Sequence, residues 1–345
     1  MELQRVPKGD AHIHLRGGKE SYKATISSGM QLARMNGISF VFDMPNTNPP
    51  LTTVKAIDDR LKLAASEGCS NGYYIWAGVT ADPNQIAEMV GLVEDPSYPV
   101  IGLKMYAGPS TGNLAIKGEK EQRDVHKELA KLGYTGPIAV HCEKESLFRM
   151  ELWDPDRPQT WADARPETAE VESIKDQVRF ILEFESDAHL HIPHVSTTQG
   201  IELRNKYSDR LSMSCGITPH HAAWSAEDMQ GHSGLLKKCN PPLRKEATRR
   251  KLYNLLLDGK IDWIETDHAP HTVDEKLNPP YASGIRSLEI YAEFVYNLQR
   301  ALMQRRLSQL VSAAGAVEQA RLYALRRIEE LTYYSIKSVF PKVKE

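Results

Sequence analysis

The sequence predicts a (β/α)8 barrel. Eight short apolar runs alternate with longer amphipathic stretches along the 345 residues, an order typical of a parallel sheet closed by crossover helices. An open doubly wound sheet is the competing architecture, but it usually shows a glycine-rich phosphate loop after an early strand, and the sequence contains none. Polar side chains also fall at the carboxyl ends of several predicted strands, where a barrel builds its active site.

The apolar runs and the stretches between them give the predicted elements in chain order. We expect strands at residues 9–14, 38–44, 72–79, 100–106, 137–142, 189–195, 211–217 and 261–267. We expect helices at residues 22–36, 53–67, 84–93, 119–132, 168–185, 200–206, 245–258, 288–305 and 308–336. Residues 1–300 are expected to form the barrel domain, and residues 301–345 a helical extension packed on it.

Composition is that of an ordinary soluble globular protein, with 41% hydrophobic and 26% charged residues. The 43 basic and 45 acidic residues give a formal net charge of −2, which provides no reason to expect a nucleic-acid or membrane partner. No apolar run approaches the roughly 20 residues that a membrane helix needs. The N-terminus also lacks a signal-peptide pattern, so we expect a cytoplasmic protein.

The four cysteines, at positions 69, 142, 215 and 239, are widely spaced and form no C-x-x-C motif. Their spacing suggests neither a disulfide framework nor a thiolate zinc site. Two of them, Cys142 and Cys215, lie inside apolar strand-like runs and are interpreted as small core residues. The neighbouring pair His220 and His221, after the seventh predicted strand, is interpreted as structural or supporting.

The first predicted strand ends in a possible metal-binding pair. His12 and His14 are two residues apart, so on a strand their side chains point to the same face. Two adjacent imidazoles can hold a metal ion between them. Arg16 continues the alternation and could present its guanidinium beside that ion.

Further ionisable residues stand at other predicted strand ends. Four imidazoles and one carboxylate, with no thiolate, suit zinc or a similar divalent ion, and they are too many for one open catalytic site. Two ions need a bridging anion, which a lysine carbamylated by CO2 would supply. A lysine in an apolar strand is otherwise costly to bury. The six residues are His12, His14, Lys104, His141, His194 and Asp267.

Eight motifs in a fixed order carry a family resemblance. They are DAHIHLR at 10–16, MPNT at 44–47, GLKMY at 102–106, VHCE at 140–143, HVST at 194–197, TPHH at 218–221, NPPLR at 240–244 and TDHAPH at 266–271. The chain resembles the amidohydrolase superfamily and, within it, the dihydroorotase family. The resemblance covers roughly residues 9–290, and the ordered set of motifs is highly specific.

The resemblance implies a barrel of the amidohydrolase type and a centre of two Zn²⁺ ions. The two N-terminal histidines and Asp267 would bind the more buried ion, and His141 and His194 the second. Lys104, carboxylated at N6, would bridge both ions. Many relatives also carry a small β-sandwich, but here the first metal motif begins at residue 12. We therefore expect a barrel without this accessory domain.

The resemblance also implies the substrate contacts. Arg16 and Asn46 would bind the α-carboxylate of the substrate, together with His271. Asn240 stands where the family contacts the pyrimidine ring. Thr111 lies in a loop after the fourth predicted strand that corresponds to a mobile lid in some members. A planar guanidinium suits a carboxylate, which it can bind through two parallel hydrogen bonds.

The implied activity is the reversible, zinc-dependent cyclisation of N-carbamoyl-L-aspartate to L-dihydroorotate in pyrimidine (UMP) biosynthesis. Asp267 would take a proton from the attacking hydroxide and pass it to the leaving nitrogen. A homodimer and an association with aspartate transcarbamoylase are the expected assemblies. Two alternatives stay open: a hydantoinase or dihydropyrimidinase, against which Arg16 and Asn46 argue, and a non-catalytic barrel acting as an assembly partner, which should have lost the ligands.

Overall fold

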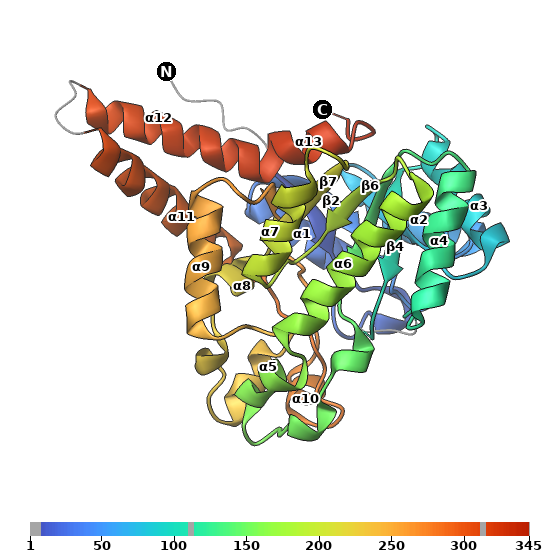
Figure 1. The fold of residues 1–345 in the computed structure, drawn as a ribbon, viewed down its shortest axis with the longest axis horizontal. Helices are drawn as coiled ribbons and strands as arrows, with labels where there is room; N and C mark the ends of the chain where they lie inside the picture. The colour runs from blue at the N-terminus through green and yellow to red at the C-terminus, as the bar shows by residue number, and fades with distance from the viewer. Residues whose placement is uncertain (1–7, 110–113, 311–314, 345) are drawn as a thin grey trace.

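The computed structural model describes residues 8–109, 114–310 and 315–344, and it has the predicted (β/α)8 architecture (Figure 1). Each strand pairs in parallel with the next one in the sequence, from the first strand to the eighth. The strands are β1 Lys8–Ile13, β2 Ile38–Asp43, β3 Tyr73–Gly78, β4 Val100–Tyr106, β5 Pro137–His141, β6 His189–Ile192, β7 Met213–Ile217 and β8 Trp263–Ile264.

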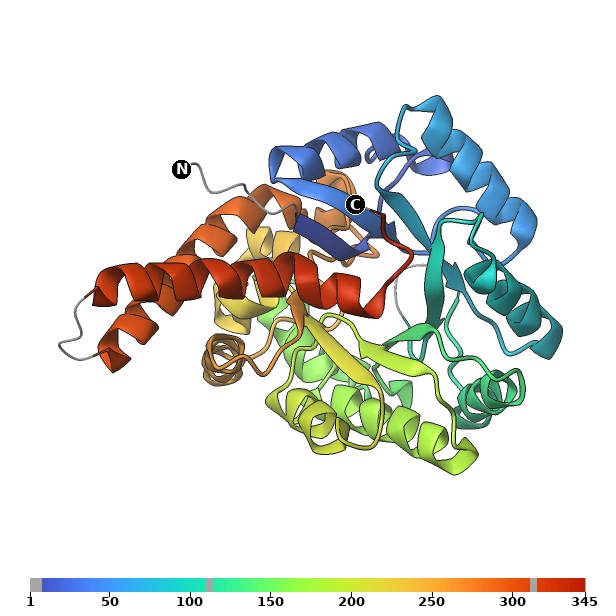
Figure 2. The ribbon, with the colours of Figure 1, turned by 90° about the horizontal axis from the view of Figure 1, so that it is seen from above.

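The longer helices form the outer ring of the barrel (Figure 2). They are α1 Ile26–Met35, α2 Val54–Ser66, α3 Pro83–Glu94, α4 Glu119–Lys131, α6 Glu167–Phe184, α7 Thr198–Tyr207, α9 Glu246–Leu257 and α11 Leu288–Gln309. Shorter turns of helix lie in the connections: η1 Gly18–Glu20, η2 Glu145–Leu147, η3 Met150–Leu152, η4 Pro158–Thr160, α5 Trp161–Ala164, α8 Pro219–Ala223, η5 Ala226–Asp228, η6 His232–Lys237 and α10 Val273–Leu277.

The barrel closes between β8 and β1 although β8 is shorter than the predicted strand at 261–267. The backbone N–H of Asp267 donates to the carbonyl of His12 (2.9 Å), and the N–H of His14 donates to that of His268 (2.8 Å). Asp267 has left-handed backbone geometry, with φ of 47°, which a continuous strand does not accept. The turn therefore ends β8 early and directs the Asp267 side chain towards the site.

Two predicted helices also differ from the structure. The first begins at Ile26 rather than residue 22, because Thr25 and Ser28 form a capping box at its N-terminus. The long helix expected at 308–336 is divided: α11 continues to Gln309, and α12 Ala316–Glu329 begins after Gly315, which has φ of 75°. A π-helical turn, η7 Glu330–Tyr334, and α13 Ser335–Val339 follow.

The C-terminal segment seals the amino end of the barrel. Figure 2 shows α13 and the residues after it lying across that opening. Phe340 is buried, and its ring lies 4.8 Å from that of Phe42, 5.4 Å from that of Trp76 and 6.0 Å from that of Trp263, measured between centroids. Lys342 Nζ donates to the carbonyl of Asp95 (2.7 Å). These contacts close the apolar core at this end.

All strands that the structure describes belong to this single barrel, and no second sheet accompanies it in the described ranges. α11 is continuous across residue 300, and the division into domains at that position stays a prediction. Within the same part of the chain, no helix is both long and apolar enough to cross a membrane.

Candidate metal centre

Three predicted ligands converge at the carboxyl ends of β1 and β8. His12 Nε2 lies 3.2 Å from His14 Nε2, and Asp267 Oδ1 lies 3.4 Å from the former and 3.0 Å from the latter. A divalent ion bound at about 2.1 Å by tetrahedral ligands would hold its ligand atoms roughly 3.4 Å apart. The three side-chain atoms therefore already have the spacing of a metal site.

A hydrogen bond orients one of these imidazoles. His14 Nδ1 lies 2.8 Å from Asn46 Oδ1, and an amide oxygen only accepts, so Nδ1 carries the proton. Nε2 of His14 is then left with a free lone pair facing the cluster. Metal-binding histidines are commonly held in this way by a partner on the second ring nitrogen.

A second pair of imidazoles lies beside the first. His141 Nδ1 is 3.1 Å from His194 Nε2, and the rings of His12 and His194 lie 5.1 Å apart between centroids. His141 Nε2 donates to Glu143 (3.0 Å), which leaves its Nδ1 unprotonated. Burial opposes ionisation of Glu143, but the Arg165 guanidinium and His141 lower the pKa of this carboxyl to about 2.

Lys104 stands on β4, which pairs with the strand that carries His141. The side chain is fully buried, and its Nζ has no hydrogen-bond partner among the residues that the structure describes. Burial lowers the pKa of Lys104 to about 8. After burial itself, the Lys104 charge is among the causes that lower the pKa values of His12, His141 and His194, so it acts on ligands of both groups.

The low pKa values of His12, His141 and His194, caused first by burial, keep these imidazoles neutral near pH 7. Neutral imidazole is the form that binds metal. An unpaired lysine and several neutral imidazoles in one buried volume are costly without a further partner. The donor set and its unsatisfied atoms therefore fit a metal centre.

Glu265 is a buried member of the site that the sequence analysis missed. Its carboxylate accepts from the backbone N–H of His194 (2.6 Å), from His191 Nε2 (3.1 Å) and from Trp263 Nε1 (3.0 Å). It also lies 3.8 Å from His12 Nδ1. The sequence did contain a signal for Glu265: on the strand predicted at residues 261–267, a residue two positions before Asp267 faces the same side of the sheet as Asp267. Glu143 bears the same relation to His141.

A small pocket opens beside the metal-ligand cluster. It brings five of the predicted residues into one lining: His14, Arg16, Asn46, Asn240 and Asp267. The remaining lining residues are Ala269, Ser283 and Gly284. The pocket therefore places the buried guanidinium of Arg16 beside His14 and Asp267, two of the proposed metal ligands. The predicted substrate contact Thr111 lies outside the described residues.

The four predicted substrate contacts that lie in the described residues are engaged within the protein, and Asn240 Oδ1, for example, accepts from Trp161 Nε1 (3.1 Å). Arg16 donates to the carbonyl of Pro270 (3.0 Å) and to His271 Nε2 (3.3 Å). Burial and the Arg16 charge lower the pKa of His271 to about 3, so His271 is a neutral acceptor that holds the guanidinium. Asn46 Oδ1 is likewise used by His14. Substrate binding by these four residues stays a prediction.

Solved structures with the same fold include a hydantoinase and a dihydroorotase. The L-hydantoinase (dihydropyrimidinase) from Arthrobacter aurescens has a TM-score of 0.78 and 21% identity, covering 97% of this chain and 71% of that one. The dihydroorotase from Saccharomyces cerevisiae in complex with 5-fluoroorotic acid has a TM-score of 0.74 and 16% identity, covering 98% and 85%. The predicted amidohydrolase-type barrel is thereby confirmed.

Sequence relatives specify the family further. The dihydroorotase of Aeropyrum pernix is 33% identical over 310 residues, 88% of this chain and 67% of that protein. The dihydroorotase of Halobacterium salinarum is 31% identical over 269 residues, 77% of this chain and 59% of that protein. The chain belongs to the dihydroorotase family. It spans about 60–70% of the length of these relatives, and it matches no known family model.

Proposed function

We propose that this protein is a dihydroorotase, which interconverts N-carbamoyl-L-aspartate and L-dihydroorotate at a centre of two zinc ions bridged by carboxylated Lys104. The observation that carries the proposal is one arrangement of side chains. Five predicted ligand residues gather in two neighbouring groups, a buried Lys104 without a hydrogen-bond partner in the described residues acts on both groups, and Arg16 lies in the adjoining pocket. Membership of the dihydroorotase family supports the same substrate.

The environment of Lys104 favours carboxylation. A pKa of about 8 leaves an appreciable fraction of neutral amine near pH 7. The amine nitrogen attacks CO2, the N–C bond forms, and one proton leaves to solvent. The product is a carbamate anion, which places two oxygens where the ammonium had no acceptor. Two cations would compensate this charge in a buried site.

The neighbouring residues would bind and orient the substrate. Arg16 offers a planar fork to the substrate carboxylate, and His271 and the Pro270 carbonyl fix the orientation of that fork. Asp267 lines the pocket, where its carboxylate can accept a proton and deliver it to the ring nitrogen during hydrolysis. Bound zinc would supply Lewis acidity and lower the pKa of water at this position.

A hydantoinase is the second candidate, because the L-hydantoinase of Arthrobacter aurescens has the same fold. Hydantoins and dihydropyrimidines need not carry a carboxylate. The guanidinium of Arg16 is nearly fully buried in the pocket lining and pairs only loosely with Glu20, at 3.9 Å, so a carboxylate on the substrate could form a closer ion pair with it. Arg16 therefore favours dihydroorotate.

The test compares the two substrates on purified, zinc-loaded protein. We expect turnover of dihydroorotate, loss of turnover with a chelator, and recovery when zinc and bicarbonate are restored. The variant Arg16→Gln should raise KM for dihydroorotate by at least about tenfold, while leaving any slow turnover of uncharged hydantoins unchanged. Faster turnover of hydantoins than of dihydroorotate by the unmodified protein would instead establish the hydantoinase.

The assembly predictions complete the proposal. A homodimer and a complex with aspartate transcarbamoylase would place the enzyme beside a source of its substrate in the cytoplasm. Sedimentation of the purified chain, alone and mixed with the transcarbamoylase, measures both states. If this chain sediments as a monomer in both samples, neither assembly forms.

A further inference from the structure

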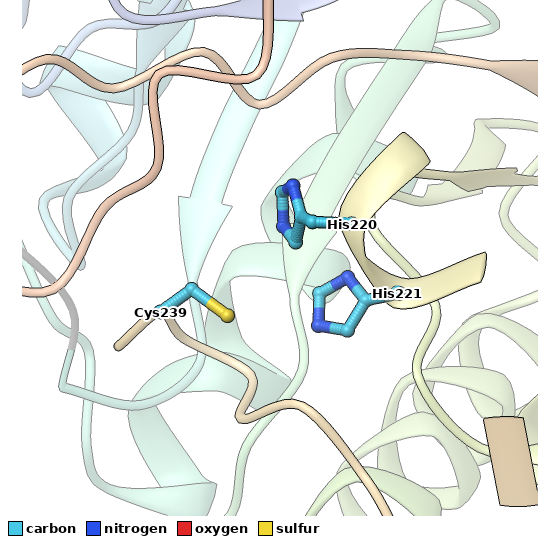
Figure 3. Close-up of side chains that lie close together, drawn as sticks. All are labelled: His220, His221 and Cys239. Carbon is cyan, nitrogen blue, oxygen red and sulfur yellow. The ribbon is translucent and has the colours of Figure 1, made fainter. Parts of the chain in front are cut away.

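A second group of metal-ligating side chains lies outside the proposed zinc centre. It consists of His220 and His221, on α8 after β7, and Cys239, on the segment after η6 (Figure 3). One ligand atom from each residue lies within 4.8 Å of the other two, and all three residues are buried. We propose that this cluster binds one divalent transition-metal ion of the zinc class. The proposal does not depend on the activity proposed above.

His220 presents a lone pair to the cluster. Its Nδ1 lies 2.9 Å from Ser287 Oγ, and the Ser287 hydroxyl points to the carbonyl of Ile285 at 3.5 Å. The hydroxyl oxygen therefore accepts from Nδ1–H, which leaves Nε2 of His220 unprotonated. Nε2 is fully buried and has no hydrogen-bond partner within the described ranges. Leaving such an acceptor unpaired in the interior is costly, and a bound metal ion would offset this cost.

The other two side chains direct their protons to a single acceptor. His221 Nε2 lies 3.0 Å from the carbonyl oxygen of Pro241, and Cys239 Sγ donates to the same oxygen at 3.2 Å. A carbonyl oxygen only accepts, so Nε2–H and S–H converge on one point. A divalent ion that replaces these two protons would meet both ligand atoms there. The Pro241 carbonyl oxygen is also close enough to act as a fourth ligand.

Thr218 can support the metal-bound form of His221. Its hydroxyl lies 2.8 Å from His221 Nδ1, and it also caps α8 by accepting from the backbone N–H of His221 (3.1 Å). A hydroxyl can either donate or accept. When a metal takes Nε2, the ring proton moves to Nδ1 and Thr218 accepts it. The Thr218 hydroxyl can therefore pair with Nδ1 of His221 whether or not that nitrogen carries the ring proton.

The types of ligand atom in the cluster indicate which metal ion it would bind. Two imidazoles and a thiolate suit zinc rather than magnesium or calcium, which prefer oxygen ligands. Zinc bonds of about 2.0–2.3 Å would hold the ligand atoms roughly 3.5 Å apart, so the cluster would close by side-chain shifts on the order of 1 Å. Burial raises the pKa of Cys239 to about 12, so metal binding releases its proton.

Two nearby cations, Arg244 and Lys276, oppose the site, and the Arg244 charge acts on both His221 and Cys239. The buried amine of Lys276 donates to the carbonyls of Lys238 and Gly284, both at 2.7 Å, and its charge contributes to the low pKa of His220. Burial lowers the pKa of Lys276 to about 7, so the lysine can lose its proton at small cost when a divalent ion binds.

Cobalt substitution separates this site from the proposed zinc centre. None of the six residues of that centre is a cysteine, so a thiolate-to-cobalt charge-transfer band would report only on a cysteine site. We expect the Co²⁺-loaded, reduced protein to show this band and to bind one more equivalent of metal than Cys239→Ser. The matched control Cys69→Ser changes another buried cysteine and should retain both the band and the full metal content.

The outcomes decide the proposal. A charge-transfer band that is lost in Cys239→Ser and kept in Cys69→Ser supports it. Absence of the band from the unmodified Co²⁺ protein overturns it, as does a band that persists in Cys239→Ser. If Cys239→Ser does not fold, as judged by circular dichroism, His220→Gln takes its place. That variant should lose one equivalent of metal, and an unchanged metal content would overturn the site.

Discussion

The two ends of the barrel use the same eight strands for opposite purposes. At the carboxyl ends, histidines, Lys104 and Asp267 face one another with several polar atoms unsatisfied. At the amino ends, Phe42, Trp76 and Phe340 fill the interior with apolar contact. Figure 1 shows the C-terminal helices and the loops around α5 and α10 at opposite ends of the molecule. Apolar packing at the amino end stabilises the fold, whereas the unsatisfied polar atoms at the carboxyl end cost stability.

Left-handed backbone angles occur at both ends of the barrel, since Glu185, which ends α6 before β6, has φ of 51°, but two of them serve the site. His194 and Asp267 both have left-handed φ angles, 42° and 47°, which cost non-glycine residues about 1–3 kcal/mol each. Both stand at the polar end, where they turn a side chain into the cluster. The burial of an aromatic side chain such as Phe340 contributes a similar amount in the opposite direction. The burial of Phe340 at the amino end therefore offsets the backbone strain of His194 and Asp267 at the carboxyl end.

A change at Asp267 should give the largest difference between the effect on activity and the effect on stability. Asp267→Asn removes the proton acceptor but retains the size of the side chain. We expect kcat for dihydroorotate to fall on the order of 10²–10⁴-fold, while the free energy of unfolding of the metal-free protein changes by less than about 1 kcal/mol. Steady-state kinetics and urea unfolding measure the two quantities. Activity close to that of the unmodified protein would refute the assigned role.

Phe340→Ala tests the opposite end. The cavity left beside Phe42 and Trp76 should lower the free energy of unfolding by about 3–5 kcal/mol. The kcat of the remaining folded protein should be unchanged, because the substitution lies at the far end of the strands. Phe340→Leu serves as the milder control. A Phe340→Ala protein of normal stability with impaired kcat would show that the two ends are coupled.

Glu265→Gln addresses the support of the metal ligands. An amide cannot accept from all the donors around Glu265, namely the His194 N–H, His191 and Trp263. We expect metal affinity to fall by about 10–100-fold, measured by competition with a chromophoric chelator. Glu145→Gln, which changes an exposed partner of Lys117, is the matched control and should have no effect. Equal affinities in the two variants would contradict a positioning role for Glu265.

A further expected effect is a pH dependence of stability to which buried histidines at the polar end contribute. Burial lowers the pKa values of His221 to about 4 and of His268 to about 3, whereas unfolded histidine titrates near 6.5. As the pH falls below about 6.5, the unfolded state binds these protons first, so the free energy of unfolding decreases towards pH 4. At pH 4 the loss should be on the order of 3 kcal/mol per histidine, because one pKa unit corresponds to about 1.4 kcal/mol.

Urea unfolding of metal-free protein between pH 7 and pH 4 measures this slope. His268→Asn should flatten it, because one of the contributing groups is gone. Phe340→Leu should lower stability equally at every pH, since it removes no titrating group. An identical slope in His268→Asn and the unmodified protein would exclude His268 as a source of the acid sensitivity.

Local sequence patterns predicted much of the fold because each depends on neighbouring residues. Apolar runs separated by amphipathic stretches set the number and order of the strands, and the confirmed barrel follows from them. Element boundaries were predicted less well. The capping box of Thr25 and Ser28 shortened the first helix, and the left-handed turn at Asp267 shortened the eighth strand. Both depend on side-chain contacts or backbone angles that periodicity does not report.

The six proposed metal ligands could be selected from the sequence because parallel strands deliver their carboxyl ends to one face. Their partners could not be selected in the same way. Glu265 reaches His191, more than seventy positions earlier, and Asn46 meets His14 across two strands. The sequence also suggested no thiolate site, since Cys239 has no second cysteine nearby. Its approach to His220 and His221 is a long-range contact.

The sequence by itself determined the strand order and the residue types that reach the carboxyl end of the barrel, because alternation and length act locally. Only the tertiary structure decided which nitrogen of each imidazole is free, which carboxylate supports it, and that Phe340 closes the opposite end. The reason is physical: hydrogen-bond direction and packing depend on distances between segments far apart in the chain, and those distances exist only after folding.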